Sequence, residues 1–311
     1  MADRHSVLFV RHLLTFSGGH LKVFDYLGHA ASAEWLEPRL YLAPGSDEVL
    51  AGSLTPAGVA RAPALAEADL YFVAGLDWAL FDEAGIDLAR APVVNLIQHV
   101  WHAHEGNPRR QYLSRPALRI CVSPEVAAAI APLANGPVLT IPNGVDLDRL
   151  AAVAATPAPR VFIGGLKNPG EAAACAAALT AAGVEVDLCI EPIAREAYLA
   201  RMGASQVSVL LPNPLEGFYL PALEAMALGS VPVVPDCVGA RSFCLEEVNC
   251  RVPTYRTEAI CVAAAGLLRD EAALRRLRLA GSATAEGHSL QGEREQALDA
   301  YRRALDQSSA V

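Results

Sequence analysis

Two carboxylates, Glu216 and Glu224, flank the predicted start of a helix, with seven residues between them. The first backbone N–H groups of a helix have no partner within it, so they attract anions, phosphate in particular. Gly217 has no Cβ and allows a ligand to come close to the backbone. A carboxylate accepts hydrogen bonds from sugar hydroxyls. The pattern therefore suits a phosphate between two polyols, which is the outline of a nucleotide sugar.

The elements around these acids are predicted in the order strand, loop, helix and strand. The apolar run Val207–Leu211 ends at Pro212, which is typical of a buried parallel strand. Pro221 suits the first turn of a helix, and Gly229 suits its end. A second apolar run, 231–234, predicts the next strand. One acid therefore lies in the loop after a strand, and the other lies about one turn inside the helix.

This segment resembles the E-x7-E signature of the retaining, GT-B-fold glycosyltransferases of family 4 (glycosyltransferase group 1); it reads EGFYLPALEAMALGSVPVV. The resemblance implies that Glu224 holds the nucleotide ribose and that Glu216 contacts the donor sugar. It also implies that the donor lies against the residues after Glu216, namely Gly217, Phe218, Tyr219 and Leu220. The alternative is an amphipathic helix with two solvated carboxylates, but the flanking Gly-Phe and Pro residues favour the donor site.

A glycine-rich loop, Gly164–Gly170, follows the predicted strand 160–163. Members of the family usually carry Gly-Arg-Leu here and a Lys a few residues later, and both cations hold the donor diphosphate. In this chain Gly165 stands at the Arg position, so that cation is missing or comes from elsewhere, in part from Arg241. Lys167 is one of two Lys against 23 Arg, which favours a phosphate contact over an ordinary surface lysine.

The first half of the chain opens with a strand, 6–10, a glycine turn and a helix, 21–33, which is the start of a Rossmann-like unit. It contains no G-x-G-x-x-G, so dinucleotide binding is not supported. Gly18 and Gly19 resemble the paired glycines that line the inter-domain cleft beside the donor phosphate in the family. A simple tight turn is the alternative.

Three histidines, His99, His102 and His104, follow the predicted strand Val93–Ile97. The carboxyl end of a strand is where open α/β sheets bind ligands. Their spacings of three and two do not fit one face of a helix, so we expect no metal site. In the family a His after the corresponding strand contacts the donor sugar, which makes His99 the first candidate and His102 the second. A structural histidine is the alternative.

The predicted fold class is α/β, a GT-B fold of two Rossmann-like domains that face a cleft. An acceptor-side domain covers 1–152, and a nucleotide-sugar-binding domain covers 158–290. The Ala- and Pro-rich stretch 151–159 is the predicted linker, and a C-terminal helix, 292–311, is predicted to join the first domain. Asp146-Leu147-Asp148 spells the D-x-D metal motif of another glycosyltransferase fold, but its place after Asn-Gly argues against that role.

Composition excludes several classes. The net charge of −9 argues against nucleic acid as a partner. No apolar run is long enough to span a membrane, and no signal peptide is visible. The 7 Cys are scattered without a C-x-x-C pair, which indicates a reducing, cytoplasmic environment.

The function predicted from these features is retaining transfer of a sugar from a nucleoside diphosphate to a glycan or small-molecule hydroxyl. The catalytic candidates are His99, Lys167 and Glu216, and no cofactor or metal is expected. A nucleotide-sugar epimerase of the same fold and a non-catalytic partner protein are the alternatives. A homodimer is a further hypothesis.

Overall fold

The computed structural model describes residues 4–153 and 155–308. Residues 1–3, 154 and 309–311, which the predicted domains and linker include, lie outside the described part. The chain divides into two compact units, and each is described by itself. Unit 1 runs to Asn143 and takes up the chain again from Gln291, and unit 2 is Gly144–Leu290.

Unit 1 is built on a seven-stranded parallel sheet, in the order β3-β2-β1-β4-β5-β6-β7. Its strands are β1 (His5–Arg11), β2 (Leu36–Leu42), β3 (Ala60–Arg61), β4 (Leu70–Ala74), β5 (Val93–Ile97), β6 (Leu118–Cys121) and β7 (Val138–Thr140). Its α-helices are α1 (Gly18–Ala31), α2 (Glu48–Leu54), α3 (Trp78–Glu83), α4 (Pro124–Ile130) and α11 (Leu290–Ser308). Short 3-10 helices are η1 (Val100–Ala103), η2 (Arg110–Ser114) and η3 (Ala131–Leu133).

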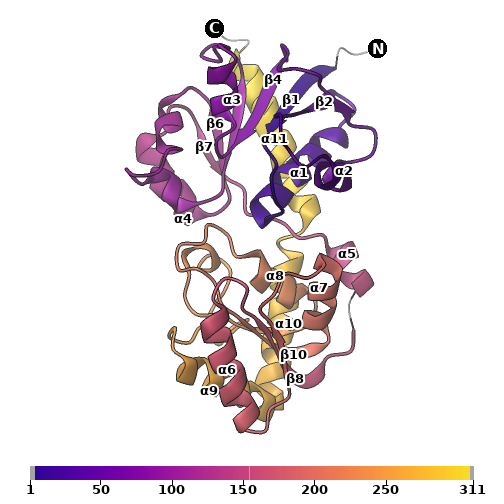
Figure 1. Cartoon of the computed structure of the whole chain (residues 1–311), viewed down its shortest axis with the longest axis vertical. Helices are drawn as coiled ribbons and strands as arrows, with labels where there is room; N and C mark the ends of the chain where they lie inside the picture. The colour runs from indigo at the N-terminus through magenta and orange to yellow at the C-terminus, as the bar shows by residue number, and fades with distance from the viewer. Residues whose placement is uncertain (1–3, 154, 309–311) are drawn as a thin grey trace. The chain divides into compact units, whose positions relative to one another are not determined.

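Helix α11 comes from the far end of the chain but lies beside this sheet (Figure 1). Aromatic side chains hold it there. Phe9 and Phe72 stack on neighbouring strands at 4.5 Å, and Tyr301 of α11 meets the edge of Phe72. The Tyr301 hydroxyl donates to the Tyr26 carbonyl of α1 at 3.1 Å. Strands buried on both faces read as continuous apolar runs, which is why β4 and β5 contain almost no polar residue.

A buried ionic cluster joins α1 to α11. Lys22 Nζ lies 2.5 Å from Glu293 Oε2 and 2.8 Å from Asp25 Oδ2, and the side chains of Lys22 and Glu293 are 1% and 0% exposed. His29 Nε2 lies 3.2 Å from Glu293 Oε1. Burial alone would lower the pKa of Lys22, but the carboxylates of Glu293 and Asp25 outweigh it and raise that pKa. The pairing therefore keeps both charges inside the unit.

Unit 2 is built on a four-stranded parallel sheet, in the order β11-β10-β8-β9. The strands are β8 (Ala158–Gly164), β9 (Val186–Cys189), β10 (Ser205–Leu210) and β11 (Val231–Val233). The helices are α5 (Leu147–Val153), α6 (Pro169–Ala181), α7 (Arg195–Gly203), α8 (Leu220–Ala227), α9 (Thr257–Arg269), α10 (Glu271–Glu286) and the 3-10 helix η4 (Val238–Ala240).

The helices of unit 2 cover both faces of its sheet. Helices α6 and α9 pack together on one face, and α7 and α8 lie on the other, with α10 against α8 (Figure 1). Val161, Val207 and Ile260 belong to the buried core between sheet and helices. Gly229, at φ +76°, follows α8, so the predicted glycine end of this helix is confirmed.

The Asp-x-Asp sequence begins a helix. Asp146 Oδ1 accepts from the Arg149 backbone N–H at 3.0 Å, at the start of α5. Such a contact satisfies an N–H group that the helix itself leaves without a partner. Helix α5 also occupies residues 151–153, which the sequence predicts as the start of a linker.

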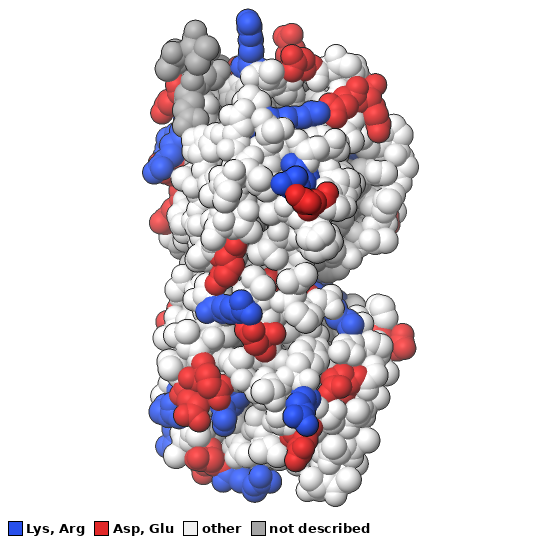
Figure 2. Space-filling view, turned by 90° about the vertical axis from the view of Figure 1, so that its left-hand side faces the viewer, with Lys and Arg blue, Asp and Glu red and all other residues white. Residues whose placement is uncertain are grey.

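Charges of both signs mix on the surface. On the face drawn in Figure 2, Lys and Arg side chains are interspersed with Asp and Glu, and neither sign gathers in a broad patch. Within the described residues, no helix combines the length and the apolar character that a membrane crossing requires.

Candidate functional site

The sheet of unit 2 has a topological switch point between β8 and β10. The chain leaves β8 toward β9 on one side and leaves β10 toward β11 on the other. The two strands are paired up to Gly164 and Leu210, so the loops that follow them begin at the same edge. In open α/β sheets, ligands bind outside the carboxyl ends of the strands at such a point. Lys167, Glu216 and Glu224 all belong to segments that start there.

Lys167 and Glu216 form an ion pair across the two loops. Glu216 Oε1 also accepts from the Asn213 backbone N–H at 3.3 Å. The Lys167 ammonium lies 5.7 Å from the centre of the Tyr219 ring, within the range of a cation–π contact. Lys167 is exposed and Glu216 is half-buried. The structure thus brings three predicted site residues together.

The Gly217-Phe218-Tyr219 turn is fixed by the loop that contains Gly239. A Cβ on Gly239 would lie 2.5 Å from the Phe218 nitrogen, so only glycine allows this approach. The Tyr219 N–H donates to the Gly239 carbonyl at 3.0 Å, and Phe218 stacks on Phe243 at 4.9 Å. Both aromatic side chains of the turn are buried, and they anchor the start of α8.

No side chain among the described residues caps the start of α8, and Pro221 occupies its first turn. An uncapped helix start leaves backbone N–H groups for other acceptors. The binding of an anion at this helix start stays a prediction.

Glu224 lies inside α8 and is paired with an arginine that the sequence analysis did not single out. Arg195 Nη2, at the start of α7, is 2.5 Å from Glu224 Oε1. The Glu224 side chain is 3% exposed and that of Arg195 is 26% exposed. One turn further along α7, the Tyr198 hydroxyl lies so close to Gly164 that a Cβ on this glycine would come closer than 3.0 Å to it. Helix α7 therefore contacts both Glu224 and the carboxyl end of β8.

Residue 165 is a glycine because the structure leaves no room for a side chain there. A Cβ at this position would come closer than 3.0 Å to the Cβ of Ala172 in α6, a separation that real side chains do not adopt. The backbone of the loop and the helix approach each other too closely for any side chain at 165. The departure from the Gly-Arg-Leu pattern is therefore built into the packing of α6.

Arg241, the proposed substitute for that cation, is paired with Asp236. Its Nε and Nη2 donate to the two carboxylate oxygens at 2.9 and 2.6 Å, and both side chains are exposed. These bonds lower the pKa of Asp236. A contact between Arg241 and a donor stays a prediction.

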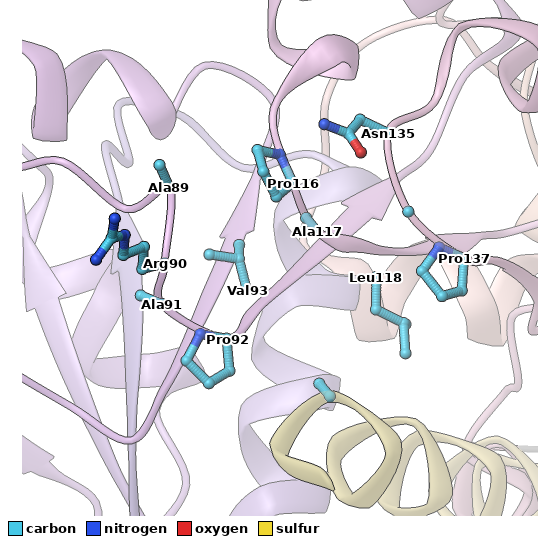
Figure 3. A pocket seen from close by; sticks show the side chains of 12 residues that line it. Ala89, Arg90, Ala91, Pro92, Val93, Pro116, Ala117, Leu118, Asn135 and Pro137 are labelled. Atoms are coloured by element: carbon cyan, nitrogen blue, oxygen red, sulfur yellow. The ribbon is translucent and has the colours of Figure 1, made fainter. Parts of the chain in front are cut away.

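Unit 1 contains a cavity of about 690 Å³ at the amino ends of β5 and β6, beside α11 (Figure 3). Its lining is mainly Ala, Pro and backbone, with Arg90 and Asn135 as the larger polar side chains. No acid or nucleophile is among the lining residues, and none of the predicted site residues belongs to it. The cavity is at the opposite strand ends from Gly19 and His99.

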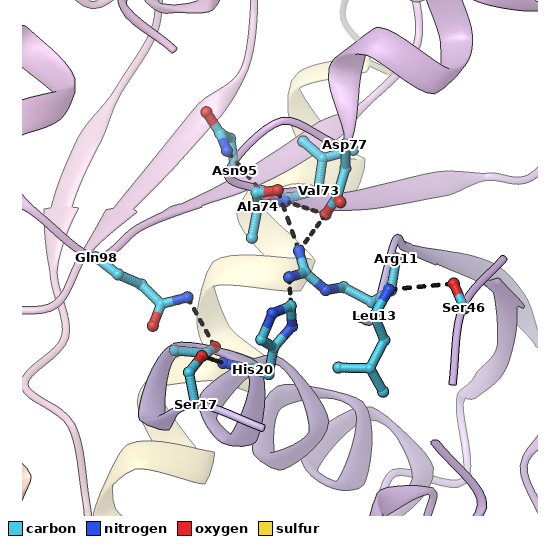
Figure 4. Close-up of polar contacts among 11 residues, drawn as sticks. Arg11, Leu13, Ser17, His20, Ser46, Val73, Ala74, Asp77, Asn95 and Gln98 are labelled. Carbon is cyan, nitrogen blue, oxygen red and sulfur yellow. Dashed lines mark hydrogen bonds and ion pairs between the residues drawn. The ribbon is translucent and has the colours of Figure 1, made fainter. Parts of the chain in front are cut away.

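The carboxyl edge of the unit 1 sheet carries a polar network around Arg11, where β1 and β4 form the switch point of this sheet (Figure 4). Arg11 Nη1 donates to Asp77 Oδ2 at 2.6 Å and to the Ala74 carbonyl at 3.1 Å. Arg11 Nη2 lies 2.8 Å from His20 Nδ1. Burial, and then the charge of Arg11, lower the pKa of His20 to about 4, so this imidazole is neutral at pH 7.

Gly18 and Gly19 form the first turn of α1, after the cap residue Ser17. The Gln98 side chain donates to the Gly19 carbonyl at 3.0 Å, and a Cβ on Gly19 would lie 3.2 Å from Gln98 Oε1. The two glycines therefore lie next to the segment that follows β5, which contains His99. Their contact with a donor phosphate stays a prediction.

His99 is the N-cap residue of the short helix η1, and His102 lies within that helix. His99 Nδ1 accepts from the Trp101 backbone N–H at 2.9 Å. His102 is buried, and burial, with the charges of Arg109 and His99, lowers its pKa to about 3. His102 is thus a neutral, enclosed residue, while the donor-sugar role of His99 stays a prediction. Among the described residues, no group of His, Cys, Asp and Glu is arranged to hold a metal ion.

Four residues of these polar contacts were not predicted from the sequence: Arg195, Tyr198, Arg11 and His20. Arg11 carries a usable signal, because it ends an apolar strand at the edge where ligands bind. His20 follows directly on Gly18 and Gly19. Arg195 has no comparable signal, because its partner is 29 residues away and only the fold brings them together.

Comparison with solved structures identifies the fold. Sucrose-phosphate synthase from Thermosynechococcus elongatus matches with a TM-score of 0.72 at 15% identity, over 98% of this chain and 100% of that one. Anabaena HepE in complex with UDP-glucose gives 0.75 at 15% identity, over 96% and 100%. A putative UDP-N-acetylglucosamine 2-epimerase from Listeria monocytogenes gives 0.68 at 10% identity, over 98% and 98%. The predicted α/β fold of GT-B type is confirmed.

No protein-family model matches the sequence. No curated protein matches it either.

Proposed function

We propose that this protein is a retaining glycosyltransferase of the family 4 type, which moves a sugar from a nucleoside diphosphate sugar to an acceptor hydroxyl. The observation that carries the proposal is the pair of acids, Glu216 and Glu224, each bound to a cation at the switch point of one sheet. Glycosyltransferase structures with the same GT-B fold, one of them in complex with UDP-glucose, support it.

The predicted site residues of unit 2 have the following roles in this proposal. Glu224 accepts hydrogen bonds from the ribose, and Glu216 accepts them from the donor sugar. The start of α8 and Lys167 hold the diphosphate. Because they are fixed positive ends, they stabilise the negative charge that develops on the leaving group. Charge stabilisation of this kind is worth about 10²- to 10³-fold in kcat for one donor.

The reaction requires no base from the protein. The bond from the anomeric carbon to the diphosphate breaks, and the acceptor oxygen bonds to that carbon on the same face. The departing diphosphate oxygen takes the acceptor proton. His99 contacts the donor sugar, Gly18 and Gly19 line the phosphate, and no metal takes part. The predicted cytoplasmic location and homodimer stay predictions.

Two variants test the proposal. A screen of nucleotide sugars by thermal stabilisation first identifies the donor, because a ligand well above its Kd raises the unfolding temperature. Lys167→Ala should then lower turnover by about 100-fold, and Glu224→Ala should mainly weaken nucleotide binding. Glu185→Ala, which removes an exposed acid paired with Arg160 at 3.7 Å, is the control. Wild-type rates and affinities in both site variants would show that the site is wrong.

An epimerase is the second candidate, favoured by the similarity to the putative epimerase from Listeria. An epimerase converts its nucleotide sugar without a second substrate. Incubation with the donor alone and analysis of the products therefore separates the two activities.

A non-catalytic partner protein is the third candidate, because Gly165 leaves the family's arginine out. Calorimetry with UDP and GDP tests it, since a protein that has lost its donor site should bind neither.

A further inference from the structure

We propose that Arg195 positions Glu224 for the recognition of ribose hydroxyls, so that selection of ribonucleotides depends on this arginine. The inference rests on the proposed function, because it assumes that Glu224 faces the nucleotide. It assigns a specificity role to a residue outside the E-x7-E segment.

The contact between the two side chains is close and enclosed. Arg195 Nη2 is 2.5 Å from Glu224 Oε1, and this is the one ion pair of Glu224 among the described residues. Glu224 is almost completely buried within α8. A buried carboxylate without a partner is strongly unfavourable, so a cation must accompany this acid. Arg195 is that cation.

Helix α7 holds Arg195 in a defined place. Arg195 is the first residue of α7, and Tyr198 lies one turn later. Tyr198 packs edge-on against Phe162 of β8 at 5.2 Å, and its hydroxyl covers Gly164. Packing of this kind fixes the helix against the strand end. The guanidinium is therefore presented to Glu224 by a rigid element and not by a loop.

A carboxylate held in this way is a selective acceptor. It has about four lone-pair positions, and the arginine occupies one of them. The remaining positions can accept hydroxyl protons, and the arginine fixes the rotation of the group. A site built to bind a substrate hydroxyl rejects an analogue that lacks it, because the buried acceptor is then left without a donor.

Calorimetry with three probes tests the proposal. The probes are UDP, 2′,3′-dideoxy-UDP and uridine, or the guanine set if GDP is the nucleotide that the native protein binds. The native protein should bind UDP at least tenfold more tightly than the dideoxy form. Arg195→Gln should reduce that ratio to less than threefold while it changes the dideoxy affinity little.

The chain offers a matched control on the same helix. Arg201 of α7 pairs with Asp187, with Nε 3.0 Å from Oδ1, and is similarly exposed. Arg201→Gln should keep the native ratio. The double variant Arg195→Gln/Glu224→Gln buries no unpaired carboxylate, so it should fold, and it should also lose the ratio.

Three results would overturn the proposal. The first is an unchanged ratio in Arg195→Gln. The second is an equal loss of affinity for UDP and its dideoxy form with uridine unaffected, because the arginine would then contact the diphosphate. The third is a native protein that binds neither UDP nor GDP, which would refute the proposed function as well.

Discussion

Adding one methyl group at Gly165 should destabilise unit 2, although the position lies in a loop. In Gly165→Ala the new Cβ would overlap the Cβ of Ala172. Neither group can rotate away, because both are attached directly to the backbone. Ala172 is fully buried in α6, so the helix must move outward or the loop must distort. Overpacking of this kind costs about 1–3 kcal/mol.

Thermal unfolding and denaturant titration measure this cost. A loss of 1–3 kcal/mol corresponds to a Tm lower by roughly 3–10 °C for a unit of this size. Gly170→Ala is the control, because a Cβ on Gly170 of α6 meets nothing within 4 Å. That change should leave stability unchanged or raise it by about 0.5 kcal/mol, since alanine favours a helix over glycine.

A second substitution tests the steric cause. Ala172→Gly removes the methyl group that the new side chain would meet. The loss of stability in the double variant Gly165→Ala/Ala172→Gly should therefore be smaller than the summed losses of the two single variants, by about 1 kcal/mol or more. Strict additivity of the two changes would refute the overlap. A Gly165→Ala protein as stable as Gly170→Ala would refute it too.

Two further predictions concern unit 1. Glu293→Gln should lower the free energy of unfolding by about 3–5 kcal/mol in denaturant titration, because it leaves the buried Lys22 without its main counter-charge. Asp299→Asn, which removes an exposed ion pair on the same helix, should lower it by less than about 1 kcal/mol. Equal losses in the two variants would refute the reasoning. Burial lowers the pKa of His102 to about 3 in the folded protein, so the unfolded chain, with an ordinary histidine pKa of about 6.5, binds more protons as the pH falls. This histidine alone should lower the free energy of unfolding by roughly 2 kcal/mol from pH 7.5 to pH 5, and His20, whose pKa is also lowered, acts in the same direction. His102→Gln should flatten that part of the pH–stability curve, and an unchanged slope would contradict the assignment.

The sequence predicts those parts of the fold that local patterns determine. Strand Val93–Ile97 is predicted with the bounds that the structure gives β5, because a strand buried on both faces is a continuous apolar run. The strand β10 and the helix α8 around Glu224 are also found at or near their predicted places. Strand β3 was not predicted, since its two residues leave no pattern.

The arrangement of charges in the site is not a local property. Lys167 and Glu216 could be chosen as candidates from their own segments, but their pairing requires two loops to start from neighbouring strands. Arg195 lies at the start of a helix with mixed polar and apolar residues, and nothing in that segment distinguishes it from Arg201. Only the packing of α7 beside α8 selects one arginine for Glu224 and leaves the other to Asp187.

The packing of α6 against the loop after β8 explains why residue 165 is a glycine. From the sequence, glycine at this position looks like the loss of a positive charge. In the structure the position has no room for a side chain of any charge, because α6 approaches the loop so closely. The two acids are each matched by one cation, Lys167 or Arg195. In the proposed function the charges of the two acids and the two cations cancel before the donor binds, so a diphosphate adds uncompensated negative charge. The positive end of α8 must then neutralise that charge, together with Lys167 after its release from Glu216. Affinity for the donor should accordingly depend on the sugar hydroxyls that replace Lys167 as partners of Glu216.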